Sequence, residues 1–480
     1  MLFILTCLYF FHSTTSAAPV SHVLHDTISP GLTSSSGQCV CPDQQRSLWD
    51  ILWSCLATIF ACTWVSVHPN IPPSGEKWWR TGLRRLELMM WALIAPELII
   101  TWAMRQWFGA RTMVRKYHGY KWTKTHAYFI QMGGFTLFEG GKPKDVLLPK
   151  QMEELLLAGR IDLPSVAEEE IRDRSKGDGL SKVVVIGQTS WFIAQCIARQ
   201  AQGLVLTKLE LVTAAFAVLN GIIYFLWWNK PLDVRCSVPV HLLDDAKPEK
   251  ERFTFKSPKK SAITRRPWDM IFPLISPPML TLASVLSWIS CLKYASSKVL
   301  KKTVMATIIS PWTALQFLFN QLENIIASEP ERLEVTGSVS TVSTFYASDS
   351  YTTPQNDIVA PCFSWIIAAL FGGLHCAAWF FAFPSYAELV IWRVCSAVIS
   401  VIPIGMFFLF ICLQRSQLSD NLMARKFLRV LIYPLAFTIL CLPVYAIARL
   451  LLLGEAFASL RSLPPDALAV VDWLSFLPHI

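Results

Sequence analysis

The stretch "WALIAPELIITWAMRQW", residues 91–107, decides the fold prediction because it is apolar enough to enter a lipid bilayer. Pro96 and Glu97, a helix breaker followed by a carboxylate, interrupt it near its middle. A proline leaves the carbonyl four residues earlier without its helical N–H partner. An ionised carboxylate at the centre of a bilayer costs about 2.5–3.5 kcal/mol. Both groups are therefore expected to face other helices or water rather than lipid.

The composition extends the membrane prediction to most of the 480 residues. Apolar residues make up 53% of the chain and charged residues 16%, whereas soluble domains have about 45–50% and about 25%. The charges gather between long apolar runs, which is the pattern of a polytopic helical membrane protein. The 43 Lys+Arg against 34 Asp+Glu lie beside these runs. We therefore expect membrane lipids as partners, and no nucleic acid.

Eight stretches are long and apolar enough to span a membrane, which predicts an all-α polytopic helical membrane protein with about eight transmembrane helices. A long polar loop follows the second span. The expected spans are 48–67, 87–104, 182–200, 208–228, 270–291, 362–383, 387–412 and 428–452. A ninth apolar stretch at 303–319 has Pro311 midway, and it is expected to span, re-enter or lie at the interface.

The predicted organisation follows from these spans and from the composition between them. In chain order it is a signal peptide at 1–18, a disordered segment at 19–47, two spans at 48–104, a polar loop region at 105–181, spans three and four at 182–228, a basic loop at 229–269, span five and a re-entrant or interfacial helix at 270–334, a Ser/Thr-rich linker at 335–357, spans six to eight at 358–452 and an interfacial segment at 453–480.

The N-terminal twenty residues set the expected location and orientation. An apolar run followed by small residues ending in Ala17–Ala18 is typical of a secretory signal peptide, although the absence of Lys or Arg before it leaves an uncleaved anchor as the alternative. This predicts the secretory pathway or the plasma membrane, with the mature N-terminus outside. Loop 68–86 then lies in the cytosol, in agreement with the positive-inside rule. Loop 229–269 is basic but falls outside, against the same rule.

Glu97 is the leading candidate functional residue. We interpret it as a proton- or cation-linked site or as half of an ion pair, with a protonated carboxyl hydrogen-bonded to Thr101 as the alternative. Arg393 lies well inside its expected span and is the preferred buried partner. Arg199 and Arg449 lie near span ends, where arginine usually extends to the headgroups.

Other polar residues within the expected spans are candidates as well. Gln188 and Gln195 are seven residues apart and therefore share a helix face. Together with Asn220 they are expected to form interhelical hydrogen bonds, and the alternative is that they line a substrate path. His375 follows two glycines and is expected to be a packing residue. No second ligand lies one turn away, so no metal site is predicted.

Three cysteines lie outside both the expected signal peptide and the expected spans. Cys236 and one of the pair Cys39 and Cys41 are candidates for a disulfide, since the predicted topology exposes them to an oxidising compartment. No phosphate-binding loop, hydrolase, zinc-protease or kinase signature occurs in the chain. We therefore predict no cofactor, and the motifs provide no argument for an enzyme.

Several stretches resemble a family of uncharacterised multi-spanning membrane proteins of filamentous fungi. The resemblance is carried by "CTWVSVHPNIP" (62–72), "APELIITWAMRQW" (95–107), "QCIARQAQGLVLTKLELVTAAFAVLN" (195–220), "YFLWWNKPLDVRC" (224–236), "FGGLHCAAWFFAFPSYAELVIWR" (371–393) and "SLRSLPPDA" (459–467) with the terminal "FLPHI". It implies a polytopic membrane protein and supplies no activity, substrate or catalytic residue.

The functional prediction is permeation or transport of an ion or small molecule, with Glu97 and the Gln188/Gln195 face as the polar path. The alternatives are a non-catalytic membrane receptor or scaffold, docking through 105–181 and 335–357, and a membrane-embedded lipid-modifying enzyme. A transport site requires polar residues from several spans to meet near mid-depth, and an enzyme requires titratable groups that share one cavity.

Overall fold

The structure is a computed structural model, and it describes residues 45–73, 75–175, 178–243, 342–348, 354–417 and 443–473. The expected signal peptide, Cys39 and Cys41, and the apolar stretches 270–291 and 303–319 lie outside these residues. The described part is predominantly helical, as the sequence predicts, and it also contains one small sheet.

Six of the described helices are long and apolar enough to cross a membrane, by length and composition. The first is α2 (Leu48–Phe60), which continues as the π-helical turn η2 (Ala61–Val65). The others are α8 (Asp178–Ala201), α9 (Lys208–Trp227), α14 (Pro354–Cys376), α15 (Tyr386–Gln417) and the helix Pro443–Arg461. The expected count of eight is not reached in the described ranges, because 270–291 lies outside them and 87–104 is not one helix.

The stretch 91–107 is divided between two helices, α3 (Trp78–Ile94) and α4 (Pro96–Lys116). The direction of the chain bends by 110° between them, at Ala95. The break has a local cause. Pro96 has no N–H and its ring would clash with an earlier carbonyl of a continuing helix, whereas the first position of a new helix tolerates it. Ala95 accordingly leaves the helical region, with φ −145° and ψ 66°. We call Ala95–Glu97 the tip of this bent pair.

The region expected as a polar loop contains regular structure. After α4 come α5 (Lys124–Gln131), β1 (Phe135–Glu139), β2 (Lys142–Val146), α6 (Pro149–Leu157) and α7 (Glu168–Asp173). β1 and β2 form an antiparallel hairpin whose turn residues Gly140 and Gly141 both have positive φ. β3 (Val238–His241) pairs with β1 in parallel, so that the sheet order is β2-β1-β3.

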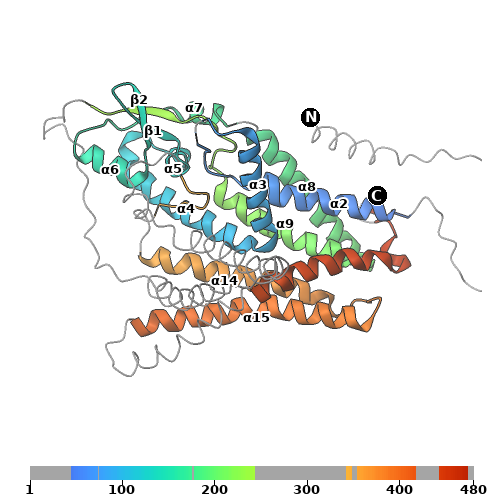
Figure 1. The fold of residues 1–480 in the computed structure, drawn as a ribbon. Coiled ribbons are helices and arrows are strands. Elements are labelled where there is room, and N and C mark those ends of the chain that lie inside the picture. Colours follow the sequence, from blue (N-terminus) through green and yellow to red (C-terminus); the bar gives the residue numbers. More distant parts are fainter. Residues whose placement is uncertain are drawn as a thin grey trace, which may run out of the picture. The chain divides into compact units, whose positions relative to one another are not determined.

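One group of contacts joins the loops around this sheet, and we call residues 66–77, 117–175, 228–243 and 342–348 the sheet end (Figure 1). Arg85 of α3 donates two 2.8 Å hydrogen bonds to the carboxylate of Asp233. Lys230 donates to the carbonyl of His68. Asn70 donates to the carbonyl of Ser343. Segments from four parts of the sequence therefore meet at this end.

A second group of contacts joins the opposite helix ends, and we call residues 45–47, 199–208, 381–388 and 458–473 the clasp end. Arg46, just before α2, forms an ion pair with Glu210 in the first turn of α9. Lys208 donates to the carbonyl of Ala382 at 2.8 Å. Arg461 forms an ion pair with Glu388 in the first turn of α15.

These two groups define how often the described chain passes from one end to the other. α2, α8 and α9 each connect the clasp end with the sheet end, whereas the α3–α4 pair leaves the sheet end and returns to it. The prediction that loops 68–86 and 229–269 lie on opposite sides of a membrane was therefore wrong for their described parts. Its cause was the assumption of one straight helix over 87–104, where the bend at Ala95 turns the chain back.

Candidate functional site

Glu97 lies at the tip of the bent pair, where Pro96 starts α4 and directs the next side chain into the interior. Its carboxylate accepts two hydrogen bonds from the helix Pro443–Arg461. Tyr445 Oη donates to Oε1 at 2.8 Å, and Arg449 Nη2 donates to Oε2 at 2.7 Å. The Arg449 and Glu97 side chains are only 4% and 5% exposed. Both oxygens of the buried carboxylate are thus satisfied by a helix almost 350 residues further along the chain.

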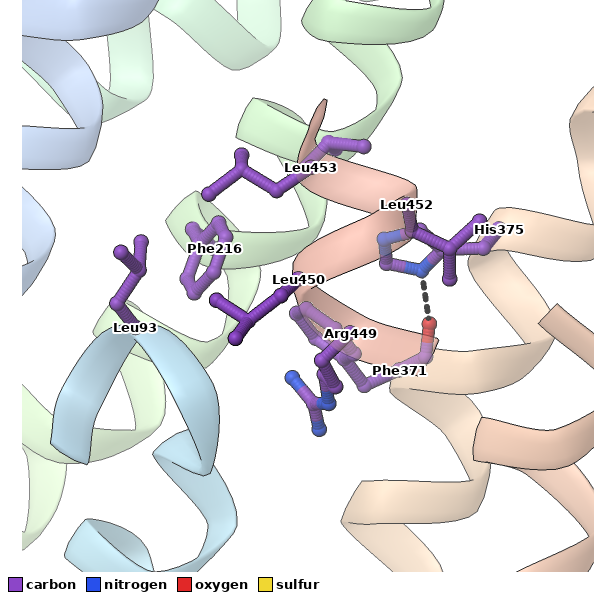
Figure 2. A pocket seen from close by; sticks show the side chains of 9 residues that line it. Leu93, Phe216, Phe371, His375, Arg449, Leu450, Leu452 and Leu453 are labelled. Atoms are coloured by element: carbon purple, nitrogen blue, oxygen red, sulfur yellow. Dashed lines mark hydrogen bonds between the residues drawn. The ribbon is translucent and has the colours of Figure 1, made fainter. Parts of the chain in front are cut away.

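Two aromatic rings complete the surroundings of Arg449. Its guanidinium carbon lies 4.0 Å from the ring centroid of Phe371 in α14, and Nη2 also donates to Tyr445 Oη at 2.5 Å. Tyr445 and Arg449 are four residues apart and so share one helix face. Phe371 also contacts His375, whose Nδ1 lies 2.8 Å from the Phe371 carbonyl (Figure 2). Side chains from three helices therefore enclose the ion pair.

The cavity beside this cluster is very small. It has a volume of about 10 Å³, and its lining includes Leu93, Phe216, His375 and Arg449 (Figure 2). Such a volume holds one water molecule at most. Arg449 Nη1 is buried and has no hydrogen-bond partner among the described residues. The cluster is therefore closed in this conformation, and Arg449 Nη1 is available to donate to a further acceptor.

The structure corrects the expected partners of Glu97. Arg393 is exposed and donates to the carbonyl of Trp379, so it takes no part in the cluster. Arg449 does not extend to the headgroups: its side chain is buried against Glu97, and its helix continues to Arg461, well beyond the expected end at 452. Thr101 donates to the backbone carbonyl of Glu97 and to Ser364, not to the carboxylate.

The other polar candidates do not join Glu97. Gln188 donates to Thr58 Oγ1 of α2 at 3.0 Å, an interhelical hydrogen bond of the expected kind, and Gln195 is half-buried on the same helix. Asn220 is buried in α9, but its Oδ1 has no partner in the described part of the chain. The predicted path that combines Glu97 with the glutamine face is therefore not formed in this conformation.

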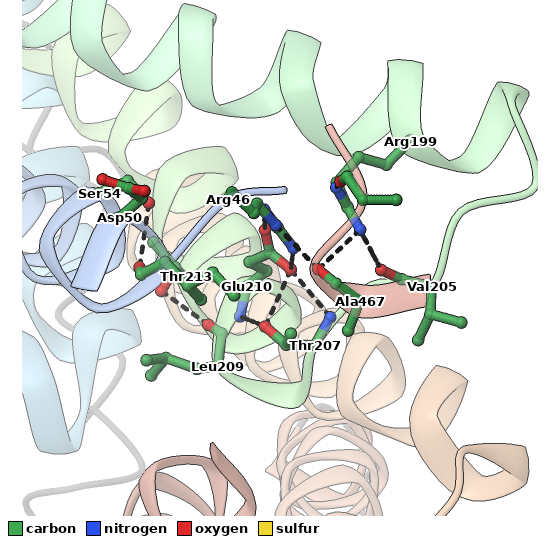
Figure 3. Close-up of polar contacts among 12 residues, drawn as sticks. Arg46, Asp50, Ser54, Arg199, Val205, Thr207, Leu209, Glu210, Thr213 and Ala467 are labelled. Atoms are coloured by element: carbon green, nitrogen blue, oxygen red, sulfur yellow. Dashed lines mark hydrogen bonds and ion pairs between the residues drawn. The ribbon is translucent and has the colours of Figure 1, made fainter. Parts of the chain in front are cut away.

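Arg199 has a role that the sequence did not indicate. It is buried, and its guanidinium donates to the carbonyls of Val205 and Ala467 (Figure 3). It also donates to the carbonyl of Ala469. Arg46 adds a hydrogen bond to the Ala467 carbonyl. The segment after Arg461, expected to lie at the membrane interface, is thus fastened to the end of α8 as far as the structure describes it.

A second buried polar cluster, which sequence reasoning missed, surrounds Lys230 at the sheet end. Its ammonium is fully buried and lies 4.3 Å and 4.4 Å from the ring centroids of Trp102 and Trp227. Nζ donates to the His68 carbonyl at 2.5 Å and to Gln106 Oε1 at 2.9 Å. Burial lowers the pKa of Lys230 well below its usual value, and the ring faces and oxygen acceptors oppose this effect.

His68 packs against the same cluster. The ring is fully buried, Nδ1 lies 2.8 Å from the Ser66 carbonyl, and Nε2 has no partner among the described residues. Burial lowers the pKa of His68 well below its usual value, and the positive charges of Lys182, Lys230 and Arg85 lower it further. The imidazole is therefore neutral in the folded protein, with its proton on Nδ1.

The remaining expectations concern cysteines and metals. Cys236 is exposed, and its expected partners lie outside the described residues, so the disulfide stays a prediction. Within the described ranges, no group of three or more His, Cys, Asp or Glu side chains is placed to hold a metal ion.

Comparison with known proteins gives one match. No curated protein and no solved structure matches this sequence. A family model described as a family of unknown function, DUF8562, matches residues 20–119, 112–250 and 356–480, which together cover most of the chain. All the residues of the Glu97 cluster and of the Lys230 cluster described above fall within these matches. The chain belongs to this family of unknown function, DUF8562.

Proposed function

We propose that this protein is an integral membrane protein that moves an ion or a small polar molecule, and that the Glu97–Tyr445–Arg449 cluster is its closed gate. The observation that carries this proposal is the position of Glu97 at the tip of a bent helix pair. Among the described residues, its carboxylate there bonds only with residues of a different helix. In membranes, broken helices are tolerated where they are buried in protein or line a cavity, and transporters use them at substrate sites.

The charge distribution supports an orientation for this arrangement. The sheet end carries Lys77, Lys121, Lys124, Lys142, Lys144, Lys150, Arg160, Arg172, Arg174, Lys230 and Arg235, and the clasp end carries Arg46, Arg199, Lys208 and Arg461. The positive-inside rule then favours a cytosolic sheet end, with the α3–α4 pair re-entering from the cytosol. This arrangement removes the earlier conflict between the rule and the basic residues at 229–243.

The chemistry of the cluster supports a gate more than a simple brace. A buried ion pair is often no more stabilising than apolar residues of the same volume, so stability alone is a weak reason to bury one. Breaking the pair leaves an unpaired charge, which draws in water or a counter-ion. Protonation of Glu97 or arrival of an anion at Arg449 Nη1 would each weaken the contact between the tip and the helix Pro443–Arg461.

A second candidate function, a receptor or scaffold, is favoured by the ordered sheet end. Residues 117–175 and 229–243 form a packed unit with helices on a three-stranded sheet rather than a flexible loop. A protein that acts by docking needs such a surface and does not need an opening gate. The proposed experiment therefore has to separate the two functions.

The test is ion flux in vesicles that contain the purified full-length chain. Separate dyes report H⁺, K⁺ and Cl⁻ movement under an imposed gradient, for the wild type and for Glu97→Gln. The glutamine keeps the size of the side chain and removes its charge. We expect low flux in the wild type and a rise of about tenfold or more in the variant, since a shift of 1.4 kcal/mol in a closed–open equilibrium changes populations tenfold.

Glu210→Gln is the matched control, because Glu210 is also a buried carboxylate paired with an arginine, Arg46, but at the clasp end. Its flux should stay at the wild-type level. If all three proteins conduct no more than empty vesicles, the transport proposal is wrong and the scaffold function becomes the better one. Equal leaks in both variants would also contradict it, because they would reflect general loosening of the bundle.

A further inference from the structure

A short segment at the sheet end, residues 342–348 ("VSTFYAS"), packs against the bent helix pair, and we call it the strap. It is the described part of a region, 244–353, that otherwise lies outside the described residues. Val342, Phe345, Tyr346, Ala347 and Ser348 are each at most 4% exposed. The Tyr346 N–H donates to the Ser343 carbonyl, so the strap contains a tight turn. The strap is therefore a buried peptide with its own local conformation.

Side chains of the bundle bind the main chain of the strap. Asn70 Nδ2 donates to the carbonyls of Ser343 and Thr344, at 3.0 Å and 3.3 Å. The carbonyl of Tyr346 accepts from Gln106 Nε2 at 2.8 Å and from Trp102 Nε1 at 2.9 Å. These contacts are made to backbone carbonyls and do not depend on the strap's side chains.

The side-chain amides of Asn70 and Gln106 are oriented by the contacts that their oxygen atoms make with Lys230 and Trp227. Gln106 Oε1 accepts from Lys230 Nζ at 2.9 Å and from Trp227 Nε1 at 3.1 Å, and Asn70 Oδ1 lies 3.4 Å from Lys230 Nζ. An amide that presents its oxygen to a cation must present its N–H groups elsewhere. In this site Asn70 Nδ2 and Gln106 Nε2 face the strap carbonyls, and Gln106 Nε2 also donates to Asn70 Oδ1 at 3.3 Å, which links the two amides.

The donor count of Lys230 matches this arrangement. An ammonium has three N–H donors, and the acceptors around Nζ are the His68 carbonyl, Gln106 Oε1 and Asn70 Oδ1. No carboxylate accepts from it among the described residues. A fully buried cation without a carboxylate partner is costly, which indicates that the geometry it imposes is needed.

We propose that Lys230 is the positioning residue of a main-chain binding site. It orients Asn70 and Gln106 to hold a short turn-forming peptide segment, here the strap, against the α3–α4 pair. The side-chain anchor of the bound segment is Phe345, which contacts the rings of Trp91 in α3 and Trp102 in α4. The strap therefore joins both arms of the bent pair, one of which is the helix that carries Glu97.

The experiment is limited proteolysis of the full-length chain by chymotrypsin, with cleavage after Phe345 and Tyr346 identified by mass spectrometry. Both residues are buried in the bound strap, so cleavage reports the population of the released state. We expect Lys230→Met, which keeps the length of the side chain and removes its donors, to raise cleavage at these two positions about tenfold or more. This readout needs no flux measurement, so its outcome is separate from that of the gate.

Lys208→Met is the matched control. Lys208 is also a buried lysine that donates to one backbone carbonyl and lies over an aromatic ring, Phe383 at 4.1 Å, but at the clasp end. Cleavage of the strap should be unchanged in this variant. Equal release by both lysine variants, or no release by Lys230→Met in a folded protein, would overturn the proposal.

Gln106→Leu tests the site independently of whether Lys230→Met folds. It retains the lysine and removes the donor to the Tyr346 carbonyl, so it should release the strap to a similar extent. If Lys230 acts through Gln106 and Asn70, the double variant Lys230→Met/Gln106→Leu should be cleaved in the strap only slightly more than the more strongly cleaved single variant. Effects that multiply in the double variant would show that Lys230 acts elsewhere, and intact protection in Gln106→Leu would overturn the main-chain site itself.

Discussion

Arg449 Nη2 lies 2.7 Å from Glu97 Oε2 although the two residues are 352 positions apart in the sequence. The contact joins the tip of the bent pair to the helix Pro443–Arg461, and water is almost excluded from both side chains. A charge pair in such a setting gains strong attraction but has lost its hydration, so its net effect on stability is small while the loss of one partner is severe.

The first prediction follows from this imbalance. Arg449→Met alone leaves the Glu97 carboxylate buried without its counter-charge and should lower the free energy of unfolding by about 3–5 kcal/mol. The double variant Glu97→Met/Arg449→Met leaves no buried charge and should recover most of that loss. Denaturant unfolding of the purified proteins in detergent measures both. Additive losses in the double variant would contradict the interpretation of this contact as a buried pair.

The second prediction concerns the pH dependence caused by His68. Its pKa is lowered in the folded state, so below about pH 6.5 the unfolded chain binds a proton that the folded chain does not. The free energy of unfolding should therefore fall as the pH falls below this value, by up to about 1.4 kcal/mol per pH unit.

Unfolding of His68→Gln between pH 7.5 and pH 5.5 checks this prediction. The amide cannot titrate, so the variant should lose much of the acid dependence, whereas His118→Gln, at an exposed histidine, should keep it. Identical slopes for His68→Gln and the wild type would mean that His68 is not the group responsible.

The third prediction uses the two adjacent glycines of α14. A Cβ at Gly372 would lie 2.5 Å from Ser400 Oγ and 2.7 Å from the Ser400 backbone nitrogen of α15, whereas a Cβ at Gly373 would meet nothing within 4 Å. Gly372→Ala should therefore destabilise the α14–α15 contact by about 1–3 kcal/mol. Gly373→Ala should be neutral or slightly stabilising, since alanine favours a helix. Thermal unfolding of the two variants compares them directly, and equal stabilities would argue against this close helix approach.

The sequence predicted the apolar helices well because their signal is local. The α9 helix, for example, ends at Trp227, one residue before the expected 228. Glu97 was also identified from its neighbours alone, since a proline and an acid in an apolar run are visible without any contact information. Its partner was not, because Arg449 was expected near the end of a span at 428–452, whereas its helix continues to Arg461. A contact between residues 352 positions apart also leaves no local signal in the sequence.

The Lys230 site could not be predicted for a different reason. Lys230 and Gln106 are 124 residues apart in the sequence. The side-chain amides of Asn70 and Gln106 can accept from Lys230 and donate to the strap only when the loops that carry Asn70, Lys230 and the strap meet. One signal did exist in the sequence. The basic residues after Trp228 conflicted with the predicted topology, and a re-entrant α3–α4 pair was the arrangement that would have removed the conflict.

The most direct test of the account is the sidedness of three introduced cysteines, at Lys77, Lys142 and Ser462, each placed alone in a chain whose Cys39, Cys41, Cys236 and Cys412 are replaced by serine. Sealed vesicles are treated with a membrane-impermeant thiol reagent from one side and then from the other. If the α3–α4 pair re-enters, Lys77→Cys and Lys142→Cys react from the same side and Ser462→Cys from the opposite side. Reaction of Lys77→Cys and Lys142→Cys from opposite sides would mean that the pair crosses the membrane, and the proposed gate would then have no re-entrant tip.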